Sequence, residues 1–311
     1  MPSKIITLIA GQNMLILYRS QMEMGGRIMF EIVLKEELAP KIKLFKVLAP
    51  EIARKAQPGQ FIILRIDEKG ERIPLTIADF DGDGGTITII FQEVGKTTDL
   101  LGSMEQGDSL LDFVGPLGME SEIKNYGTVV CIGGGVGVAP VFPIARALRE
   151  VGNTVISIIG ARNSELLFWK HKMKQVSSKL HIATDDGSAG QKGFVTDILA
   201  EILDQTHVDR IISIGPVPMM EAVCRVAPDN ITTMVSLNPI MVDGTGMCGA
   251  CRVEVNNQTR FACVDGPEFD GHQVNWELVK MRARMFVKEE KEVLTHSCGE
   301  GECQCHKKDE K

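Results

Sequence analysis

The chain lacks the features of a nucleic-acid-binding or membrane-spanning protein. Its 311 residues carry a formal net charge of −7 with no block of basic residues, which argues against nucleic acid as a partner. Two apolar runs near the N-terminus, Ile5–Ala10 and Met14–Tyr18, are too short to cross a bilayer, and no signal-peptidase pattern follows them. We therefore expect a cytoplasmic protein without a membrane partner.

The sequence also lacks a recognisable acid–base pair, an activated nucleophile and an internal repeat. His207 and His272 have no base or nucleophile near them in the sequence, so neither is assigned a catalytic role. No secretory signal accompanies the eight cysteines, which favours metal ligands or free thiols in a reducing compartment. The length exceeds what one hydrophobic core supports, so two or three domains are expected.

What the chain does have is a compact pattern of metal ligands. Asp243–Cys251 reads Asp-Gly-Thr-Gly-Met-Cys-Gly-Ala-Cys, and Cys263 follows. The spacing is that of the C-x4-C-x2-C…C pattern of plant-type iron–sulfur proteins, with aspartate at the first position. It predicts a [2Fe–2S] cluster held by Asp243, Cys248, Cys251 and Cys263. A structural zinc on the same four side chains is the alternative.

The expected elements divide the chain into a β part and an α/β part. Up to about Leu117, short strands rich in Val, Ile and Phe alternate with turns, which favours a small antiparallel barrel. After Gly118, apolar strands alternate with helical segments, as in a parallel sheet with crossover helices. The expected strands are Ile42–Leu48, Gln60–Ile66, Thr86–Gln92, Thr128–Ile132, Val155–Gly160, Leu180–Thr184 and Arg210–Gly215, and the expected helices are Val141–Val151, Glu165–Gln175 and Val195–Gln205.

We therefore expect a multidomain β plus α/β fold with a small cysteine-rich module. The predicted segments are a leader at 1–28 outside the fold, the barrel at 29–118, a nucleotide-binding domain at 119–233, the cluster module at 234–275 and a charged tail at 276–311. The tail carries Cys298, Cys303 and Cys305 between His296 and His306. These side chains could take up a metal, although a charged terminus with free thiols is the interpretation we favour.

Two further motifs indicate nucleotide cofactors. Gly133–Gly137 lies between a predicted strand and helix, where glycines let a diphosphate approach the backbone and the helix N-terminus is partially positive. Its spacing departs from G-x-G-x-x-G because Pro140 takes the third place, and alone it could be a plain loop. Arg72–Thr76 offers an arginine for a diphosphate and a hydroxyl for a flavin ring nitrogen. An ordinary edge strand fits that segment equally well.

The three parts occur in the order flavin, nicotinamide, iron–sulfur. This order and the motifs resemble the ferredoxin–NADP reductase superfamily over about residues 29–275. More narrowly, the chain resembles electron-transfer subunits of dihydroorotate dehydrogenase and the small subunits of NADH-dependent ferredoxin:NADP oxidoreductases, also called sulfide dehydrogenases. Dihydroorotate subunits use four cysteines, whereas the bifurcating transhydrogenases have one aspartate and three cysteines. Asp243 matches the second pattern.

The resemblance implies FAD, NAD(H) and a [2Fe–2S] cluster, with Arg72 on the flavin diphosphate and Thr76 near the ring. NADP(H) stays open as an alternative because Arg162 follows the second strand of the nucleotide-binding domain. The implied flavin-binding residues are Pro58, Gly59, Gln60, Arg72, Pro74, Leu75, Thr76, Gly95, Thr97 and Thr98. The implied nicotinamide-binding residues, at the carboxyl ends of the parallel strands, are Gly133, Gly134, Gly135, Gly137, Arg162, Asp185, Asp186, Gly215, Pro216 and Met219.

As a whole, the resemblance implies an oxidoreductase subunit that passes electrons between NAD(H), FAD and the cluster. Its implied partner is a larger subunit with flavin and further iron–sulfur clusters, through which the pair bifurcates electrons between ferredoxin and NADP. Three alternatives remain: an electron-transfer subunit of dihydroorotate dehydrogenase, a stand-alone NAD(P)H-dependent reductase, and a non-catalytic docking module stabilised by zinc.

Overall fold

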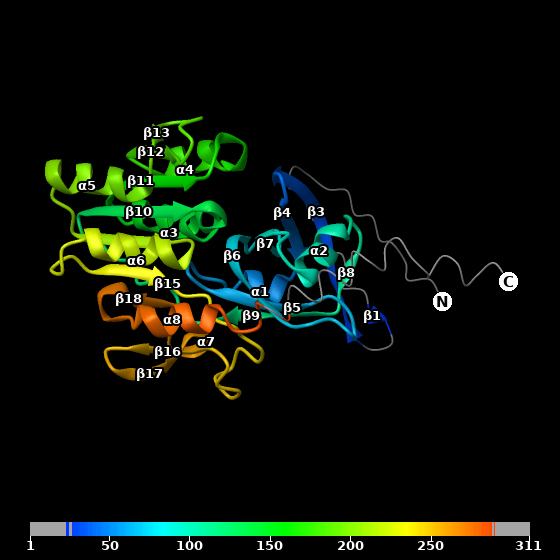
Figure 1. Cartoon of the computed structure of the whole chain (residues 1–311). Coiled ribbons are helices and arrows are strands. Elements are labelled where there is room, and N and C mark those ends of the chain that lie inside the picture. Colours follow the sequence, from blue (N-terminus) through cyan, green and yellow to red (C-terminus); the bar gives the residue numbers. More distant parts are fainter. Residues whose placement is uncertain (1–22, 25–26, 288, 290–311) are drawn as a thin grey trace.

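The computed structural model describes residues 23–24, 27–287 and 289, which contain two large sheets and a small third module (Figure 1). Most of the predicted leader and the three tail cysteines lie outside the described residues. At the N-terminal edge of the described part, β1 (Glu23–Met24) and β2 (Arg27–Ile28) pair as a two-stranded antiparallel sheet. None of the helices in the described part is long and apolar enough to cross a membrane.

The β part is a seven-stranded antiparallel sheet in the order β8-β3-β4-β7-β6-β5-β9. Phe45, Ile62 and Ile89 are fully buried inside it, as expected for strands that present one face to a core. Two expected strands are confirmed with identical bounds. The elements are β3 (Phe30–Ala39), β4 (Ile42–Leu48), α1 (Pro50–Ala53), β5 (Phe61–Arg65), β6 (Ile73–Asp81), β7 (Thr86–Gln92), α2 (Lys96–Ser103), β8 (Ser109–Leu110) and β9 (Asp112–Leu117).

The α/β part is a second seven-stranded sheet, in the order β13-β12-β11-β10-β14-β15-β18. All of its pairings are parallel except that of β18 with β15. The core on one face contains α3 and α4, and the core on the other face contains α5 and α6. The elements are β10 (Thr128–Gly134), α3 (Val138–Glu150), β11 (Thr154–Ala161), α4 (Lys170–Val176), β12 (Lys179–Thr184), β13 (Gln191–Lys192), α5 (Val195–Gln205), β14 (Arg210–Ile214), α6 (Val217–Val226), β15 (Thr233–Ser236) and β18 (Glu268–Asp270).

One expected helix is wrong in its first half. The segment predicted as a helix over Glu165–Gln175 forms a single 3-10 turn at Ser164–Leu166, then an extended step, and only then α4. Leu167 and Phe168 are both buried, and Trp169 has a left-handed backbone with φ +53°. A residue in the left-handed region cannot continue a right-handed helix, so the chain turns at Trp169 and α4 begins only after it.

The third module follows β15 and packs against both larger parts. It contains the hairpin of β16 (Arg252–Val255) and β17 (Gln258–Phe261), the short helix α7 (Ala262–Asp265) and α8 (Trp276–Ala283). Its hydrophobic core includes Phe61 and Ile63 from the barrel and Met220 from α6. Figure 1 shows the module in orange below the parallel sheet, which β18 joins at its edge.

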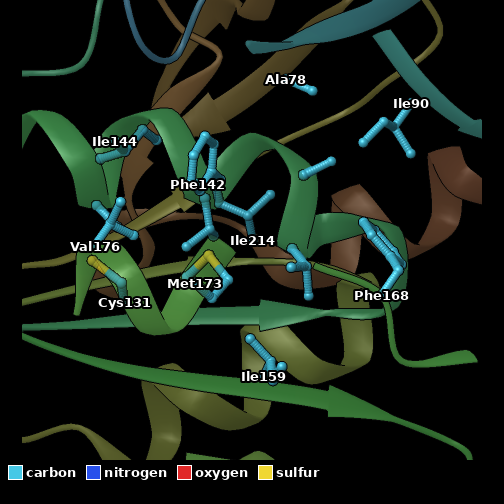
Figure 2. Close-up of a cluster of buried hydrophobic side chains, with 14 of the residues drawn as sticks. Ala78, Ile90, Cys131, Phe142, Ile144, Ile159, Phe168, Met173, Val176 and Ile214 are labelled. Carbon is cyan, nitrogen blue, oxygen red and sulfur yellow. The ribbon is translucent and has the colours of Figure 1, made fainter. Parts of the chain in front are cut away.

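The barrel and the α/β part share a continuous core through α3. Ala78 and Ile90, from strands β6 and β7, belong to the same buried cluster as Phe142 and Ile144 of α3 (Figure 2). Beside this cluster the Arg146 guanidinium donates to the Asp79 carboxylate over 2.8 Å. Arg146 also lies 5.3 Å from the Phe142 ring centroid and 5.8 Å from that of Phe80. Arg146 therefore links α3 to strand β6 by an ion pair and by cation–π contacts.

Replacement of Arg146 by alanine should weaken the link between barrel and α/β part. A half-buried ion pair supported by ring contacts leads us to expect a loss of about 1 kcal/mol in the free energy of unfolding. Urea denaturation measures this loss, and Arg149→Ala, which removes an exposed arginine from the same helix, is the control. Equal shifts of the urea midpoint in the two variants would contradict the assigned role of Arg146.

Candidate functional site

A cavity of about 910 Å³ opens where the barrel meets the carboxyl edge of the parallel sheet. Its walls come from β6 and β7, from the turn after β10, from the ends of β11 and β14, and from the chain after β15. Ligands of open parallel sheets bind at this edge. The volume is in the range of small-molecule and cofactor sites, which is roughly 300–1,000 Å³.

The cavity gathers twelve of the residues predicted to bind the two nucleotides. These are Pro74, Leu75, Thr76, Thr98, Gly134, Gly135, Gly137, Arg162, Asp185, Gly215, Pro216 and Met219. The other eight predicted residues do not line it: Pro58, Gly59, Gln60, Arg72, Gly95, Thr97, Gly133 and Asp186. Residues that sequence reasoning assigned separately to flavin and to nicotinamide thus share one cavity, with the flavin set on the barrel side.

The glycine-rich turn has two kinds of glycine. A Cβ on Gly137 would lie 2.1 Å from the Ile214 carbonyl oxygen, and one on Gly133 would lie 2.8 Å from Val138 Cα. These two glycines therefore allow α3 to start close against the sheet. Gly135 has φ +54° and open space around its Cβ position, so its backbone faces the cavity without obstruction. That arrangement lets a diphosphate reach the backbone N–H groups before α3.

On the barrel side, Arg72 immediately precedes strand β6, whose Pro74, Leu75 and Thr76 line the cavity. The Nε atom of Arg72 is buried and has no hydrogen-bond partner among the described residues. An unsatisfied buried cationic donor is costly, and a phosphate oxygen is a strong acceptor for it. The residues present here therefore fit a flavin diphosphate.

The turn at 58–60 is occupied by contacts within the protein. Gly59 has φ +85°, and a Cβ there would lie 2.2 Å from Ser121 Oγ. The Gln60 side-chain amide donates to the Gly118 carbonyl over 3.0 Å, and its Oε1 accepts from the Gln57 N–H over 2.9 Å. The turn thus fixes the segment that follows the barrel. Its predicted role in flavin binding stays a prediction.

Of the three predicted residues at the start of α2, Thr98 lines the cavity and Gly95 and Thr97 do not. The Thr98 hydroxyl accepts from the Gly95 N–H over 3.0 Å at the start of the helix, and Thr98 also lines the cavity. Thr97 donates its hydroxyl hydrogen to the Glu71 carboxylate over 3.1 Å, which ties the loop to the segment before Arg72. Gly95 and Thr97 therefore hold this loop in place without lining the cavity.

The two aspartates after β12 differ in what they can offer a ligand. The Asp186 carboxylate accepts from the N–H and the hydroxyl of Ser188 at 2.9 and 2.6 Å, and these bonds hold the pKa of Asp186 below its usual value. Asp185 is exposed and lines the cavity, as Arg162 does. An acceptor for ribose hydroxyls and a cation suited to a 2′-phosphate thus stand at the same end of the cavity.

Three of the predicted cluster ligands lie on the loop before β16, and the fourth, Cys263, lies in α7 after the β16–β17 hairpin. Cys251 and Cys263 are buried, with their Sγ atoms 3.1 Å apart. On the same loop, Asp243 is half-buried and Cys248 is exposed. Within the part of the chain that the structure describes, no three or more His, Cys, Asp or Glu side chains converge as ligands of one metal ion.

The cluster ligands nevertheless affect one another's pKa values. Hydrogen bonds from the backbone N–H groups of Ala250 and then Asp243 lower the pKa of Cys248, which favours the thiolate that iron requires. Burial and the neighbouring Cys251 raise the pKa of Cys263 to about 11, and Cys248 contributes in the same direction. The buried thiols and the backbone donors fit a thiolate-held iron–sulfur cluster, in which N–H groups point at sulfur.

The ligand loop is packed directly on the barrel. Gly244 has φ +84°, and a Cβ there would lie 2.6 Å from Ile63 Cδ1 and 2.9 Å from Leu117 Cδ1. Bonds from Thr245 lower the pKa of the Asp243 carboxyl, and the positive charge of Arg72 adds to that effect. The candidate flavin ligand Arg72 and the candidate cluster ligand Asp243 therefore lie within electrostatic reach of each other.

Sequence reasoning missed several residues of the cavity. Asn238 and Met241 line it just before the ligand loop, and Pro267 lines it just after the last cluster ligand. Phe194 lines it from the start of α5. The sequence marks these positions only weakly. Phe194 belongs to a Gly-Phe pair before a predicted helix, and the other three residues flank the metal-binding motif.

Two family models match separate parts of the chain. Residues 131–225 match the oxidoreductase NAD-binding domain, and residues 238–275 match the iron–sulfur cluster binding domain of dihydroorotate dehydrogenase B. The first match spans the glycine-rich turn, and the second spans all four predicted cluster ligands.

Relatives extend the similarity over nearly the whole chain. A protein of Thermotoga maritima, named as a homologue of the dihydroorotate dehydrogenase B (NAD(+)) electron transfer subunit, is 46% identical over 283 residues, covering 90% of this chain and 100% of its own. The electron transfer subunit of Shouchella clausii is 34% identical over 250 residues, covering 77% and 90%.

Among solved structures, a chain of an NADH-dependent reduced ferredoxin-NADP oxidoreductase superposes with a TM-score of 0.83. It is 44% identical, and the match covers 88% of this chain and 100% of that one. Phthalate dioxygenase reductase has a TM-score of 0.54 at 15% identity, covering 74% and 87%, and shows the shared fold alone.

Fold, site and relatives agree with the resemblance read from the sequence. The zinc-held docking module is not supported by any of them. The chain belongs to the family of dihydroorotate dehydrogenase B electron transfer subunits and their homologues, within the ferredoxin–NADP reductase superfamily, and is an NAD(P)H-dependent oxidoreductase that uses FAD, NAD(H) and a [2Fe–2S] cluster.

Proposed function

We propose that this chain is the small subunit of an NADH-dependent ferredoxin:NADP oxidoreductase that bifurcates electrons. In this role it exchanges a hydride with NAD(H) and single electrons with a larger subunit, which carries flavin and further iron–sulfur clusters and reacts with ferredoxin. The observation that carries the proposal is the packing of the Asp243 loop on the barrel, within electrostatic reach of Arg72 and near the cavity lined by residues predicted to bind both nucleotides.

The chain's own residues position the reactants. Bound flavin is the group that converts a two-electron hydride transfer into single-electron steps. Arg72 holds the diphosphate at the edge of the barrel, and Thr76 in strand β6 supplies a hydroxyl for the ring. Gly135 leaves the backbone open for the dinucleotide diphosphate. No side chain has to move a proton in a hydride transfer, which accords with the lack of an acid–base pair in the sequence.

Asp243 favours this assignment over a subunit of dihydroorotate dehydrogenase. The bifurcating small subunits carry an aspartate and three cysteines, and this chain has that set. Its solved relative named as an NADH-dependent reduced ferredoxin-NADP oxidoreductase is 44% identical. The relatives named as dihydroorotate dehydrogenase B subunits keep that function as the second candidate.

An apolar surface around the cluster loop supports a partner subunit. Met247 is 88% exposed next to Cys248, and Val242, Val264 and Met119 are also exposed. Met119 belongs to the same region because its N–H donates to the Gly266 carbonyl. Exposed apolar side chains that gather around a redox site indicate a protein interface, since solvent alone gives no reason to keep them there.

Isolation of the native complex tests the proposed function. We expect the chain to purify from its host with a larger flavoprotein that contains iron–sulfur clusters. The complex should reduce NADP with NADH and reduced ferredoxin together, and should not form orotate from dihydroorotate. A complex that forms orotate and leaves ferredoxin unused would assign the chain to the second candidate. A chain that purifies alone and reacts fully with ferredoxin would make it a stand-alone reductase.

Replacement of Arg72 by alanine should weaken FAD binding. Loss of a charged contact to the diphosphate costs about 2–3 kcal/mol, or roughly fiftyfold in affinity. Flavin retained per chain after dialysis measures the effect, and Lys69→Ala, which removes an exposed cation from the preceding turn, is the control. Retention of flavin by the Arg72 variant at the level of the parent would refute its assigned role.

Replacement of Asp243 by alanine should make the cluster labile, whereas Asp243→Cys should keep iron and shift the midpoint potential and spectrum toward the all-thiolate type. A carboxylate is a harder, less electron-donating ligand than a thiolate. Iron content, visible absorption and redox titration provide the measurements. The control is a Cys298→Ser, Cys303→Ser, Cys305→Ser variant, which should keep its iron. An Asp243→Ala protein with unchanged iron, spectrum and potential would show that Asp243 is not a ligand.

A further inference from the structure

One arginine of the cluster module carries a half-buried charge that no carboxylate neutralises. Arg282 lies in the last turn of α8, and its side chain donates to the Ala250 carbonyl over 2.7 Å. Its Nε is buried and has no hydrogen-bond partner in the described part of the chain. Burial lowers the pKa of Arg282, and no acidic side chain among the described residues forms an ion pair with it. A guanidinium keeps its charge even so, and an unpaired charge removed from water is costly.

The helix that carries Arg282 is fixed to the hairpin of the module. The Asn275 side-chain oxygen accepts from a backbone N–H in the first turn of α8 over 3.1 Å, and its amide donates to the Glu254 carboxylate of β16 over 2.7 Å. The Trp276 indole N–H donates to the Gly271 carbonyl over 3.0 Å. These bonds hold α8 against the hairpin, so Arg282 is presented to the cluster loop from a fixed position.

Arginines hold both carbonyl groups of the turn that follows Cys248. The Arg252 guanidinium donates to the Gly249 carbonyl over 3.0 Å, and Arg282 binds the next carbonyl, that of Ala250. The N–H of Ala250, at the other end of the first of these peptide groups, lowers the pKa of Cys248 through a hydrogen bond to its sulfur. Because the N–H and C=O of a trans peptide point in opposite directions, a guanidinium on each carbonyl leaves the N–H groups on the side of the ligand sulfurs.

The charge of Arg282 also reaches the cluster site. Burial and then the charge of Arg252 lower the pKa of Arg282, whereas Cys251 raises it, so that buried ligand lies within electrostatic reach. Reduction of a [2Fe–2S] cluster adds one negative charge, and the potential depends on charge, on hydrogen bonds to sulfur and on exposure. Solvent screens a half-buried cation less than an exposed one such as Arg252. Arg282 should therefore stabilise the added electron more than Arg252 does.

We propose that Arg282 raises the midpoint potential of the [2Fe–2S] cluster and so makes it a better electron acceptor for the flavin of the same chain. In that step one electron leaves the reduced flavin and enters the oxidised cluster. Arg282 acts through its charge and through the Ala250 carbonyl and is not itself a ligand. The inference deepens the proposed function and rests on the predicted ligand set, whereas the choice of partner subunit does not enter it.

The test is a redox titration of the flavin- and cluster-loaded full chain, followed by electron paramagnetic resonance of the reduced cluster. Arg282→Gln removes the charge and should make reduction of the cluster about tenfold less favourable, which is a midpoint potential lower by about 59 mV for one electron. Arg282→Lys keeps the charge and should stay close to the parent. The flavin potential should shift less than that of the cluster, because Arg282 contacts the cluster loop.

Two further arginine variants serve as matched controls. Arg284→Gln removes an exposed charge just after α8 and should leave the midpoint potential of the cluster unchanged. Arg252→Gln removes the bond to the Gly249 carbonyl together with an exposed charge, and it should lower the potential less than Arg282→Gln does. Iron content per chain shows whether each variant is fully loaded.

A fully loaded Arg282→Gln chain with the parent's cluster potential would overturn the inference. An equal loss of potential in Arg282→Lys would also overturn it, because the charge would then not be the cause. If Arg282→Gln loses its iron, Arg282→Lys decides: parental iron content and potential support the role of the charge, and loss of iron there as well would make Arg282 a purely structural residue.

A parent chain without the spectrum of a [2Fe–2S] cluster would contradict the ligand set itself, and the inference would fall with it. None of these results depends on a partner subunit. Failure of the inference on a loaded chain would therefore leave the proposed function in place.

Discussion

The close packing of the cluster loop on the barrel is the constraint on which the arrangement of the site depends. Gly244 has no side chain and a left-handed backbone, and Ile63 and Leu117 occupy the space that a Cβ would need. Any other residue would push the loop outward and separate Asp243 from Arg72. Since electron transfer between cofactors requires short separations, this one contact links the metal motif at the C-terminal end of the fold to the flavin motif near its start.

A buried donor without a hydrogen-bond partner marks a place where a bound ligand gains free energy. The buried Arg72 Nε has no partner among the described residues, and burial raises the pKa of the Cys263 thiol. The unpaired donor is unfavourable on its own and becomes favourable when a phosphate oxygen accepts from it, whereas Cys263 stays a neutral thiol until iron displaces its proton. Bonds within the protein satisfy Gln60 and Asp186 instead, so those side chains offer a ligand less.

The sequence predicted the parts of this structure that local periodicity controls. The bounds of β4, β7 and α5 match the expected segments, because regular alternation or a helical stripe marks each of them. It failed at Leu167–Trp169, where the left-handed backbone of Trp169 separates a 3-10 turn from α4. The cluster ligands stand close together in the sequence and could be named. Phe194 and Asn238 could not, because only the tertiary structure brings them to the cavity beside the glycine-rich turn.

One chain is expected to hold a continuous path from NAD(H) through FAD to the cluster. Anaerobic titration of the isolated, fully loaded chain with NADH, followed by visible absorption and by electron paramagnetic resonance at low temperature, tests it most directly. We expect the resonance of the reduced [2Fe–2S] cluster to appear as the flavin absorption bleaches, with no other protein present. A flavin that bleaches while the cluster remains oxidised, although dithionite reduces it, would contradict the claim.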